Sequence, residues 1–418
     1  MTSPSAPPAV QPKGPGFPEF VCLIACLMAL NALAIDSMLP ALPMIGDALG
    51  VVRENDRQWI VTAYLLGFGV TQVIYGPLAD RFGRKPILMV GVTLYVLFSV
   101  LAALAPTFEM LLLARVGTGV GAAALRVLAV SIVRDRYEGR TMARVMSLSF
   151  LVFLGVPILA PSIGAAILTM GPWPWIFGVL ALAGSAVMLW VAIRLPETLH
   201  VEDRLPIQPA RILGAFRHAL TERKSIGYTL AMTAITGALF GFINSSQQIF
   251  EHVFHAANLF PLVFAAIAGG IAAGTLVNAA LVEKLGSRLI AHSALVAFTA
   301  TAAVHATVSA LGHETIWTFA ILQGLTMFFF GFIAGNLGAM AMESMGHIAG
   351  TASSAQGFVS TTFGSLTGFF IGQHFAGTAT PLLMGFVVCG LTALACAFWA
   401  ERGRLFTARH APGAATPT

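Results

Sequence analysis

The chain has 418 residues, of which 57% are hydrophobic and only 10% are charged, and its formal net charge is +5. Soluble domains carry about 25% charged residues, so this composition excludes a soluble globular protein. In a membrane protein a positive net charge does not indicate nucleic-acid binding, because only the distribution of Lys and Arg between loops is informative.

Twelve apolar segments of about 20 residues follow one another, and each is long enough to cross a bilayer. We place them near 20–42, 58–79, 86–106, 109–133, 143–169, 173–194, 226–250, 260–282, 289–311, 314–342, 350–375 and 381–401. The sequence therefore predicts an all-α integral membrane protein.

The twelve predicted spans divide into two bundles of six. The N-terminal bundle covers 20–194 and the C-terminal bundle covers 226–402, with a charged linker at 195–225 between them. Residues 1–19, rich in Pro, Ser and Ala, are predicted to be a disordered tail, and 403–418 form a second tail.

Lys and Arg lie almost entirely in alternate loops. Only Arg53 and Arg57 fall in loops on the other side, and Arg115 and Arg126 fall within spans. The positive-inside rule then predicts that both tails and the linker are cytoplasmic.

A charged turn between the second and third spans is repeated at about half the length of the chain. The first copy reads Gly76-Pro-Leu-Ala-Asp80-Arg81-Phe-Gly83-Arg84-Lys85-Pro86, and the weaker copy reads Leu281-Val-Glu283-Lys284-Leu-Gly286-Ser-Arg288. Repetition at half-length predicts two similar, pseudo-symmetric bundles, which is typical of secondary transporters.

The first copy also resembles the cytoplasmic loop motif between the second and third helices of the major facilitator superfamily. Its glycines, aspartate and arginines stand at the expected places. This resemblance implies a fold of twelve helices with a central cavity between the halves, lined by spans one, four, seven and ten.

Charged residues inside spans are costly and must be paired or face water. Asp36 in span one and Arg115 in span four lie at similar depth when the rise is counted as about 1.5 Å per residue. We expect them to pair, directly or through water; the alternative is a static ion pair that only fixes helix packing. Arg126, on nearly the same helix face as Arg115, either snorkels to the interface or lines a cytoplasmic cavity.

Three segments resemble the bicyclomycin/chloramphenicol-resistance type of drug:proton antiporter (the Bcr/CflA family). They are Ala34-Ile-Asp36-Ser-Met-Leu-Pro40-Ala-Leu-Pro43, Leu113-Ala-Arg115 with its following small residues, and Leu195-Pro-Glu197-Thr-Leu199. Thr118 departs from the family, whose members often carry glutamine there.

Span five resembles the Gly/Pro motif of exporters in the superfamily. Pro157, Pro161 and Gly164 match it and predict a helix bend, whereas Ala160 and Ala165 replace glycines. Ordinary proline kinks of a membrane helix are the alternative interpretation.

The resemblance implies a proton-coupled exporter of small amphipathic drugs that works by alternating access. Asp36 is the predicted proton carrier, with Arg115 favouring its charged form. A proton-coupled transporter of a metabolite or nutrient and a non-transporting membrane sensor remain alternatives. The residues contain no nucleophile with its base and no phosphate-binding glycine loop, so we expect no enzymatic activity.

Two further sets of residues are predicted to act in transport. A cytoplasmic gate comprises Gly76, Asp80, Arg81, Gly83, Arg84 and Asp135, closing against the start of span eleven at Gly350; the alternative is that these charges only set topology. The substrate cavity comprises Asn31, Tyr64, Gln72, Thr118, Asn244, Gln247, Gln323 and Asn336.

The four cysteines, Cys22, Cys26, Cys389 and Cys396, lack metal-ligand spacing and are predicted to be packing residues. We expect no metal and no cofactor. The expected partners are a small-molecule substrate, protons and the lipid bilayer, without nucleic acid, and the protein is predicted to be a monomer in a bacterial inner membrane.

Overall fold

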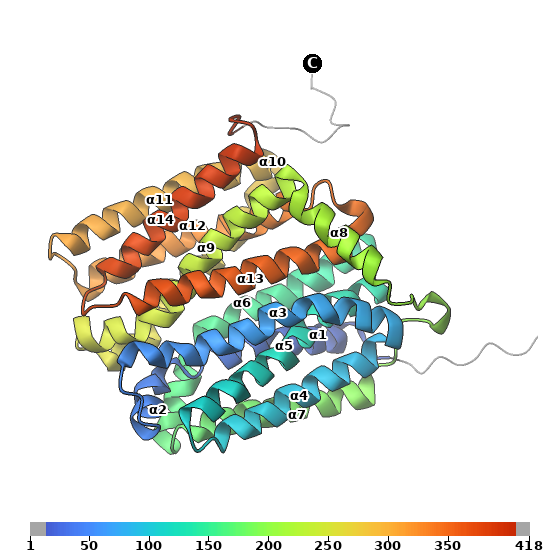
Figure 1. Cartoon of the computed structure of the whole chain (residues 1–418), viewed down its shortest axis with the longest axis horizontal. Coiled ribbons are helices and arrows are strands. Elements are labelled where there is room, and N and C mark those ends of the chain that lie inside the picture. The colour runs from blue at the N-terminus through green and yellow to red at the C-terminus, as the bar shows by residue number, and fades with distance from the viewer. Residues whose placement is uncertain (1–13, 407–418) are drawn as a thin grey trace, which may run out of the picture.

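The computed structural model describes residues 14–406, and helices make up almost all of this range (Figure 1). No strand occurs in it. The predicted all-α class is therefore confirmed. Residues 1–13 and 407–418, which form most of the two predicted tails, lie outside the described residues.

The helices before the linker form the N-terminal half. In chain order they are α1 (Phe17–Asp36), α2 (Leu42–Ala48), α3 (Trp59–Phe82), α4 (Arg84–Ala103), α5 (Phe108–Arg136), α6 (Gly139–Met170) and α7 (Pro174–Arg194). The first helix begins at Phe17, three residues earlier than predicted, because Pro18 in its first turn is compatible with a helix start.

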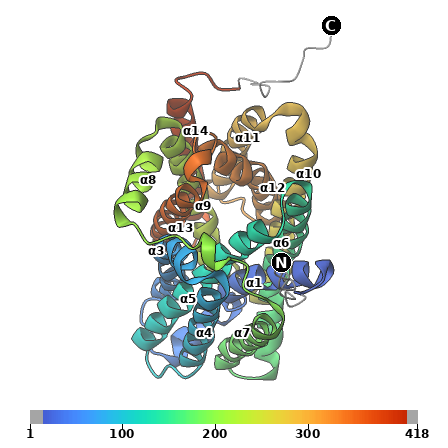
Figure 2. The same ribbon diagram turned by 90° about the vertical axis from the view of Figure 1, so that its right-hand side faces the viewer.

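The helices after the linker form the C-terminal half. They are α9 (Arg223–Gln248), α10 (Phe260–Leu285), α11 (Ser287–Ala310), α12 (Ile316–Ala341), α13 (Ala349–Gln373) and α14 (Thr380–Ala400). Within each half the helices pack closely on one another, and two helix pairs, α3 with α13 and α6 with α10, make the main contacts between the halves (Figure 2).

The linker contains one α-helix, α8 (Pro209–Thr221), which the span prediction did not include. Phe216 and Ala219 of this helix pack against Met345 and Ala352 of the C-terminal half. The backbone N–H of Leu205, just before α8, donates to the carbonyl of Asp80 at the end of α3. The linker therefore contacts both halves on one side of the molecule, called here the linker side; the opposite side is called the far side.

Eleven helical segments in the described range are long and apolar enough to cross a membrane, with α1 and α2 counted as one segment. The remaining predicted span corresponds to α13, whose 25 residues extend over about 37 Å. This helix is less apolar because it carries Ser, Thr and Gln, and it packs against α3 and α9.

The predicted repeat has the same backbone form in both halves. Gly83 separates α3 from α4 with φ of 103°, and Gly286 separates α10 from α11 with φ of 80°. Glycine adopts such angles without steric strain, which accounts for glycine at both positions.

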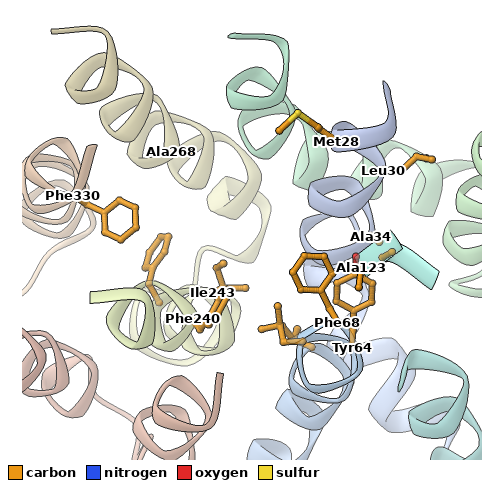
Figure 3. Packing of buried hydrophobic residues seen from close by; sticks show 14 of the residues in the cluster. Met28, Leu30, Ala34, Tyr64, Phe68, Ala123, Phe240, Ile243, Ala268 and Phe330 are labelled. Atoms are coloured by element: carbon orange, nitrogen blue, oxygen red, sulfur yellow. The ribbon is translucent and has the colours of Figure 1, made fainter. Parts of the chain in front are cut away.

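Close packing within the N-terminal half depends on the small residues of α5. A β-carbon on Gly119 would meet the backbone of Tyr64 and Phe68 in α3. Figure 3 shows these two aromatic side chains near Ala34 of α1, with Phe240 and Ile243 of α9 on the other side of the interface between the halves. Gly119 thus brings α5 against the part of α3 that holds central aromatic residues.

We predict that Gly119→Val destabilises the protein by about 1–3 kcal/mol, because an added side chain overpacks the contact of α5 with α3. Gly178→Val is the matched control, since a β-carbon on that exposed glycine of α7 meets no atom within 4 Å. Thermal unfolding in detergent measures both, and equal losses in the two variants would contradict the packing account.

Candidate functional site

Asp36 is the last residue of α1 and is only 4% exposed. Its Oδ1 atom and the hydroxyl of the neighbouring Ser37 have no hydrogen-bond partner in the described structure. Gly164 of α6 lies against the backbone carbonyl of Ser37. A buried carboxyl oxygen without a partner is energetically costly and is typical of a functional position.

Arg115 is fully buried in α5 and is held by backbone carbonyls. Its Nε donates to the carbonyl oxygen of Ile60 at 3.1 Å, and its Nη2 donates to that of Ala34 at 2.9 Å. The guanidinium carbon lies 4.6 Å from the centre of the Tyr64 ring, a cation–π contact.

Asp36 and Arg115 form no direct ion pair in the described structure, so the direct form of the predicted pairing is wrong, and pairing through water stays a prediction. The two residues do lie at the same level, because Arg115 binds the carbonyl of Ala34, two residues before Asp36. The carbonyl of Ala34 in the last turn of α1 and that of Ile60 in the first turn of α3 satisfy the guanidinium in place of the carboxylate. One nitrogen of Arg115, Nη1, keeps no partner.

Two other predicted residues join this central group. The hydroxyl of Tyr64 donates to Oδ1 of Asn31 at 3.1 Å, while Nδ2 of Asn31 has no partner. Thr118, one turn from Arg115, bonds the carbonyl of Ala114 in its own helix. Asn31, Asp36, Tyr64 and Arg115 are hereafter called the central cluster.

The polar residues predicted in the C-terminal half are buried as well. Both side-chain polar atoms of Asn244 and of Gln323 lack partners. Gln247 donates to Glu251 in the next turn, and Asn336 donates to Asn278. Counted from the linker-side helix ends, Asn244 and Gln323 lie at about 27–32 Å, the same level as Asp36.

A cavity of about 790 Å³ opens on the linker side. Of the eight predicted cavity residues only Gln72 lines this cavity, and a role of the other seven in binding substrate stays a prediction. The other seven are buried. They lie near the level of the central cluster, or they form hydrogen bonds within their own half. The cavity is lined instead by parts of α3, α5, the linker with α8, and the start of α13.

The predicted gate residues do form a charge cluster. Arg84 contacts Asp80 at 2.6 Å and Asp135 at 2.8 Å, and its backbone N–H donates to Glu197 at 2.9 Å. Arg84 is only 4% exposed, whereas Arg81 is exposed and has no ion pair among the described residues.

This gate cluster lies within the N-terminal half and does not close the cavity. Asp80 and Gly76 line one wall, and Gly350 of α13 lines another. The predicted closing contact between Asp80 and the start of α13 is therefore absent from this conformation of the described chain. Arg84 binds the Asp80 carboxylate in its place.

The C-terminal half has an analogous cluster that the sequence reasoning missed. Arg288 contacts Glu343, after α12, and Glu401, after α14, at 2.8 Å. Burial alone would raise the pKa of Glu401, but hydrogen bonds from Arg288 and Tyr228 hold that pKa below its usual range. The position of Glu401 after α14 matches that of Glu197 after α7. Aligning the sequence of one half with that of the other could have found this correspondence.

The far side is closed by amide side chains from both halves, also missed from the sequence. Gln58 donates to Gln248 at 2.7 Å, and Gln248 donates to Asn55 at 2.9 Å. Gln373 donates to the backbone carbonyl of Asn55 at 2.6 Å. These four residues, called the far-side network, join the ends of α9 and α13 to the start of α3, and beside them His252 contacts Glu54 at 3.0 Å.

The prolines of the exporter-like motif lie inside α6. Pro157 and Pro161 are both accommodated within the continuous helix Gly139–Met170. Gly164 is the member of the motif that makes the closest contact, against Ser37. The motif thus covers the side of α1 that carries Asp36.

No group of three or more potential metal ligands occurs among the described residues. The cysteines in this range are all free, and Cys389 is buried.

Comparison with known proteins adds independent information. Residues 24–372 match the family model described as Major Facilitator Superfamily. The bicyclomycin resistance protein homolog of Haemophilus influenzae is 28% identical over 88% of this chain and 93% of its own length. The multidrug resistance protein MdtL of Shewanella oneidensis is 30% identical over 53% of this chain and 55% of its own length.

A solved structure of similar fold is the xylose transporter XylE from E. coli in a partially occluded inward-open conformation. It superposes with a TM-score of 0.70 at 11% identity, over 92% of this chain and 97% of XylE. At this identity the likeness shows the fold alone, and it agrees with two bundles of membrane helices.

We predict that Arg84→Gln lowers the stability of the protein by about 1–3 kcal/mol, because it leaves two carboxylates without their common partner. Arg81→Gln removes the same charge from the same loop but breaks no described ion pair, so it should change stability little. Thermal unfolding in detergent compares the variants. Equal effects would show that these charges serve only to set topology.

Proposed function

The chain belongs to the major facilitator superfamily, and on that basis we propose that it is a proton-driven exporter of small amphipathic drugs in a bacterial inner membrane. The names of two relatives refer to resistance to bicyclomycin and to multiple drugs. This supports export of toxic compounds over uptake of a nutrient. The open cavity and the division into two halves that meet at two helix pairs support a transporter over a sensor.

The observation that supports proton coupling is the buried carboxyl group of Asp36, which has an oxygen without a partner. A neutral carboxylic acid tolerates this environment far better than a carboxylate does. Asp36 therefore carries a proton in the conformation seen here. Arg115, bonded to Ala34 close by, supplies positive charge that stabilises the carboxylate once water reaches it.

The linker side is the cytoplasmic side in this proposal. It carries Arg84, Arg134 and Arg288, in agreement with the positive-inside rule, and the described residues begin and end there. The structure is then an inward-open state, with the far-side network closed toward the periplasm. The two bundles, 20–194 and 226–402, rock against each other through α3–α13 and α6–α10, and the protein works as a monomer.

Transport follows from these parts in sequence. A drug enters the cavity from the cytoplasm, and the halves rock until the far-side network separates. Water then reaches the central cluster together with the buried amides of Asn244 and Gln323, which contact the drug before release. Asp36 gives up its proton to the cytoplasm when the drug enters and takes up another from the periplasm once the drug has left. This neutralisation permits return to the inward-open state, so protons move inward as the drug moves outward.

We predict that Asp36→Asn reduces energised efflux at least about tenfold, to the level seen with a protonophore, because the amide cannot carry a proton. Efflux of chloramphenicol, ethidium and nalidixate from a drug-hypersensitive strain is the measurement, at matched membrane expression. Asp203→Asn, at an exposed linker aspartate, is the control and should retain efflux. Full efflux by Asp36→Asn of any drug that the wild type exports would refute the role of Asp36.

A further inference from the structure

The cavity on the linker side has an excess of positive charge. Three arginines line it, Arg84, Arg126 and Arg134, against the single carboxylate of Asp80. Arg84 and Asp80 pair with each other, and Asp135 also binds Arg84. His218 of α8 lies on the wall as well and has an interaction of its own. The charges left over are those of Arg126 and Arg134.

Arg126 is the deepest of these arginines. It lies ten residues before the end of α5, which places it about 15 Å from the linker-side end of that helix. Gln72 of α3 lies at a similar depth, ten residues before the end of its helix, and also lines the cavity. Arg126 is therefore too deep for membrane-surface snorkelling to be its main role, and it faces the cavity.

Arg126 has no hydrogen bond or ion pair with any described residue, and its side chain is exposed in the cavity. The contrast with Arg115, eleven residues earlier on the same helix face, is informative. Arg115 is enclosed and bonded to two backbone carbonyls. Nothing in the described fold satisfies Arg126, so its guanidinium is available to a ligand.

The first turn of α13 adds positive potential to the same cavity. Gly350 and Thr351 line the wall, and no described side chain caps this helix end. Arg134 of α5 extends toward Gly350 from the facing wall. A helix start and an arginine on opposite walls both favour an anion between them.

The remaining lining is largely apolar. It includes Val73, Val127 and Val130 from the N-terminal half, Ile207 from the linker, and Met342. A ligand that fits this cavity combines an apolar body with a negatively charged group.

We propose that this cavity binds amphipathic organic anions, with the carboxylate or sulfonate held by Arg126 at the deep end. The proposal deepens the function proposed above, since it names a substrate class for the inward-open site. A guanidinium suits such groups because it donates two parallel hydrogen bonds to them. The bound anion would then move from the linker side toward the central cluster as the halves rock.

A pair of fluorescent probes tests the charge preference directly. 8-Anilino-1-naphthalenesulfonate and N-phenyl-1-naphthylamine share the same aromatic body, and only the first carries a sulfonate. Binding of each is titrated to the purified full-length protein in phosphatidylcholine nanodiscs, with empty nanodiscs as the background. Phosphatidylcholine has no net negative charge, so no lipid headgroup of this kind competes for Arg126.

The wild type is expected to bind the sulfonate probe more tightly than the neutral probe. Arg126→Gln should weaken sulfonate binding at least about tenfold, the effect of losing a charge-assisted hydrogen bond, with neutral-probe binding within about twofold. Arg126→Lys should retain most of the preference. Arg140→Gln is the matched control, because this exposed arginine is on the linker side and outside the cavity lining.

Unchanged sulfonate binding in Arg126→Gln would overturn the proposal, as would an equal loss in Arg140→Gln. If Arg126→Gln does not fold, Arg134→Gln and Arg126→Lys still decide the question. The quantity compared is then the ratio of sulfonate-probe affinity to neutral-probe affinity in each variant. The binding assay needs no proton gradient, so its result is independent of the efflux result for Asp36→Asn. Export of ethidium alone, with no Arg126-dependent anion binding, would leave the proposed function standing and reject this inference.

Discussion

Placing a charged carboxylate in the middle of a membrane costs about 2.5–3.5 kcal/mol even with local relaxation, and the surroundings of Asp36 follow from that cost. The residue stands where α1 ends, and Gly164 lets α6 close over the turn at Ser37. The enclosed position is compatible with a neutral acid. Any movement that opens α1 to water therefore also changes the proton affinity of Asp36, which is the link a proton-coupled transporter needs.

The contacts that close the far side are suited to breaking and forming again. The far-side network of Asn55, Gln58, Gln248 and Gln373 consists of neutral amides, whose hydrogen bonds contribute only about 0.5–1.5 kcal/mol each. In water the same groups bond to solvent instead, so the halves can part without leaving a charge buried. The charge cluster around Arg84 lies within the N-terminal half and holds the helix ends of that half together while the halves move.

Much of this arrangement could be predicted from sequence. Hydropathy gave the membrane helices, since a bilayer imposes their length, and the glycine repeat at Gly83 and Gly286 located the same turn in both halves. The cluster of Arg84 with Asp80 and Asp135 was also expected. A direct pair of Asp36 with Arg115 was not correct, because backbone carbonyls are acceptors that a sequence does not display. The cavity lining depended on which conformation the halves adopt, and no residue pattern encodes one conformation alone.

The most direct test of the central claim measures opening of the far side as a function of pH. Spin labels replace the exposed residues Val52 and Leu311, one in each half on the far side, in a chain without its native cysteines. Because a charged Asp36 resists burial, the distance between the labels should increase when the pH is raised from about 5 to about 9. The same labels in Asp36→Asn should report a closed far side throughout. An identical pH response with and without the Asp36 carboxylate would contradict the account.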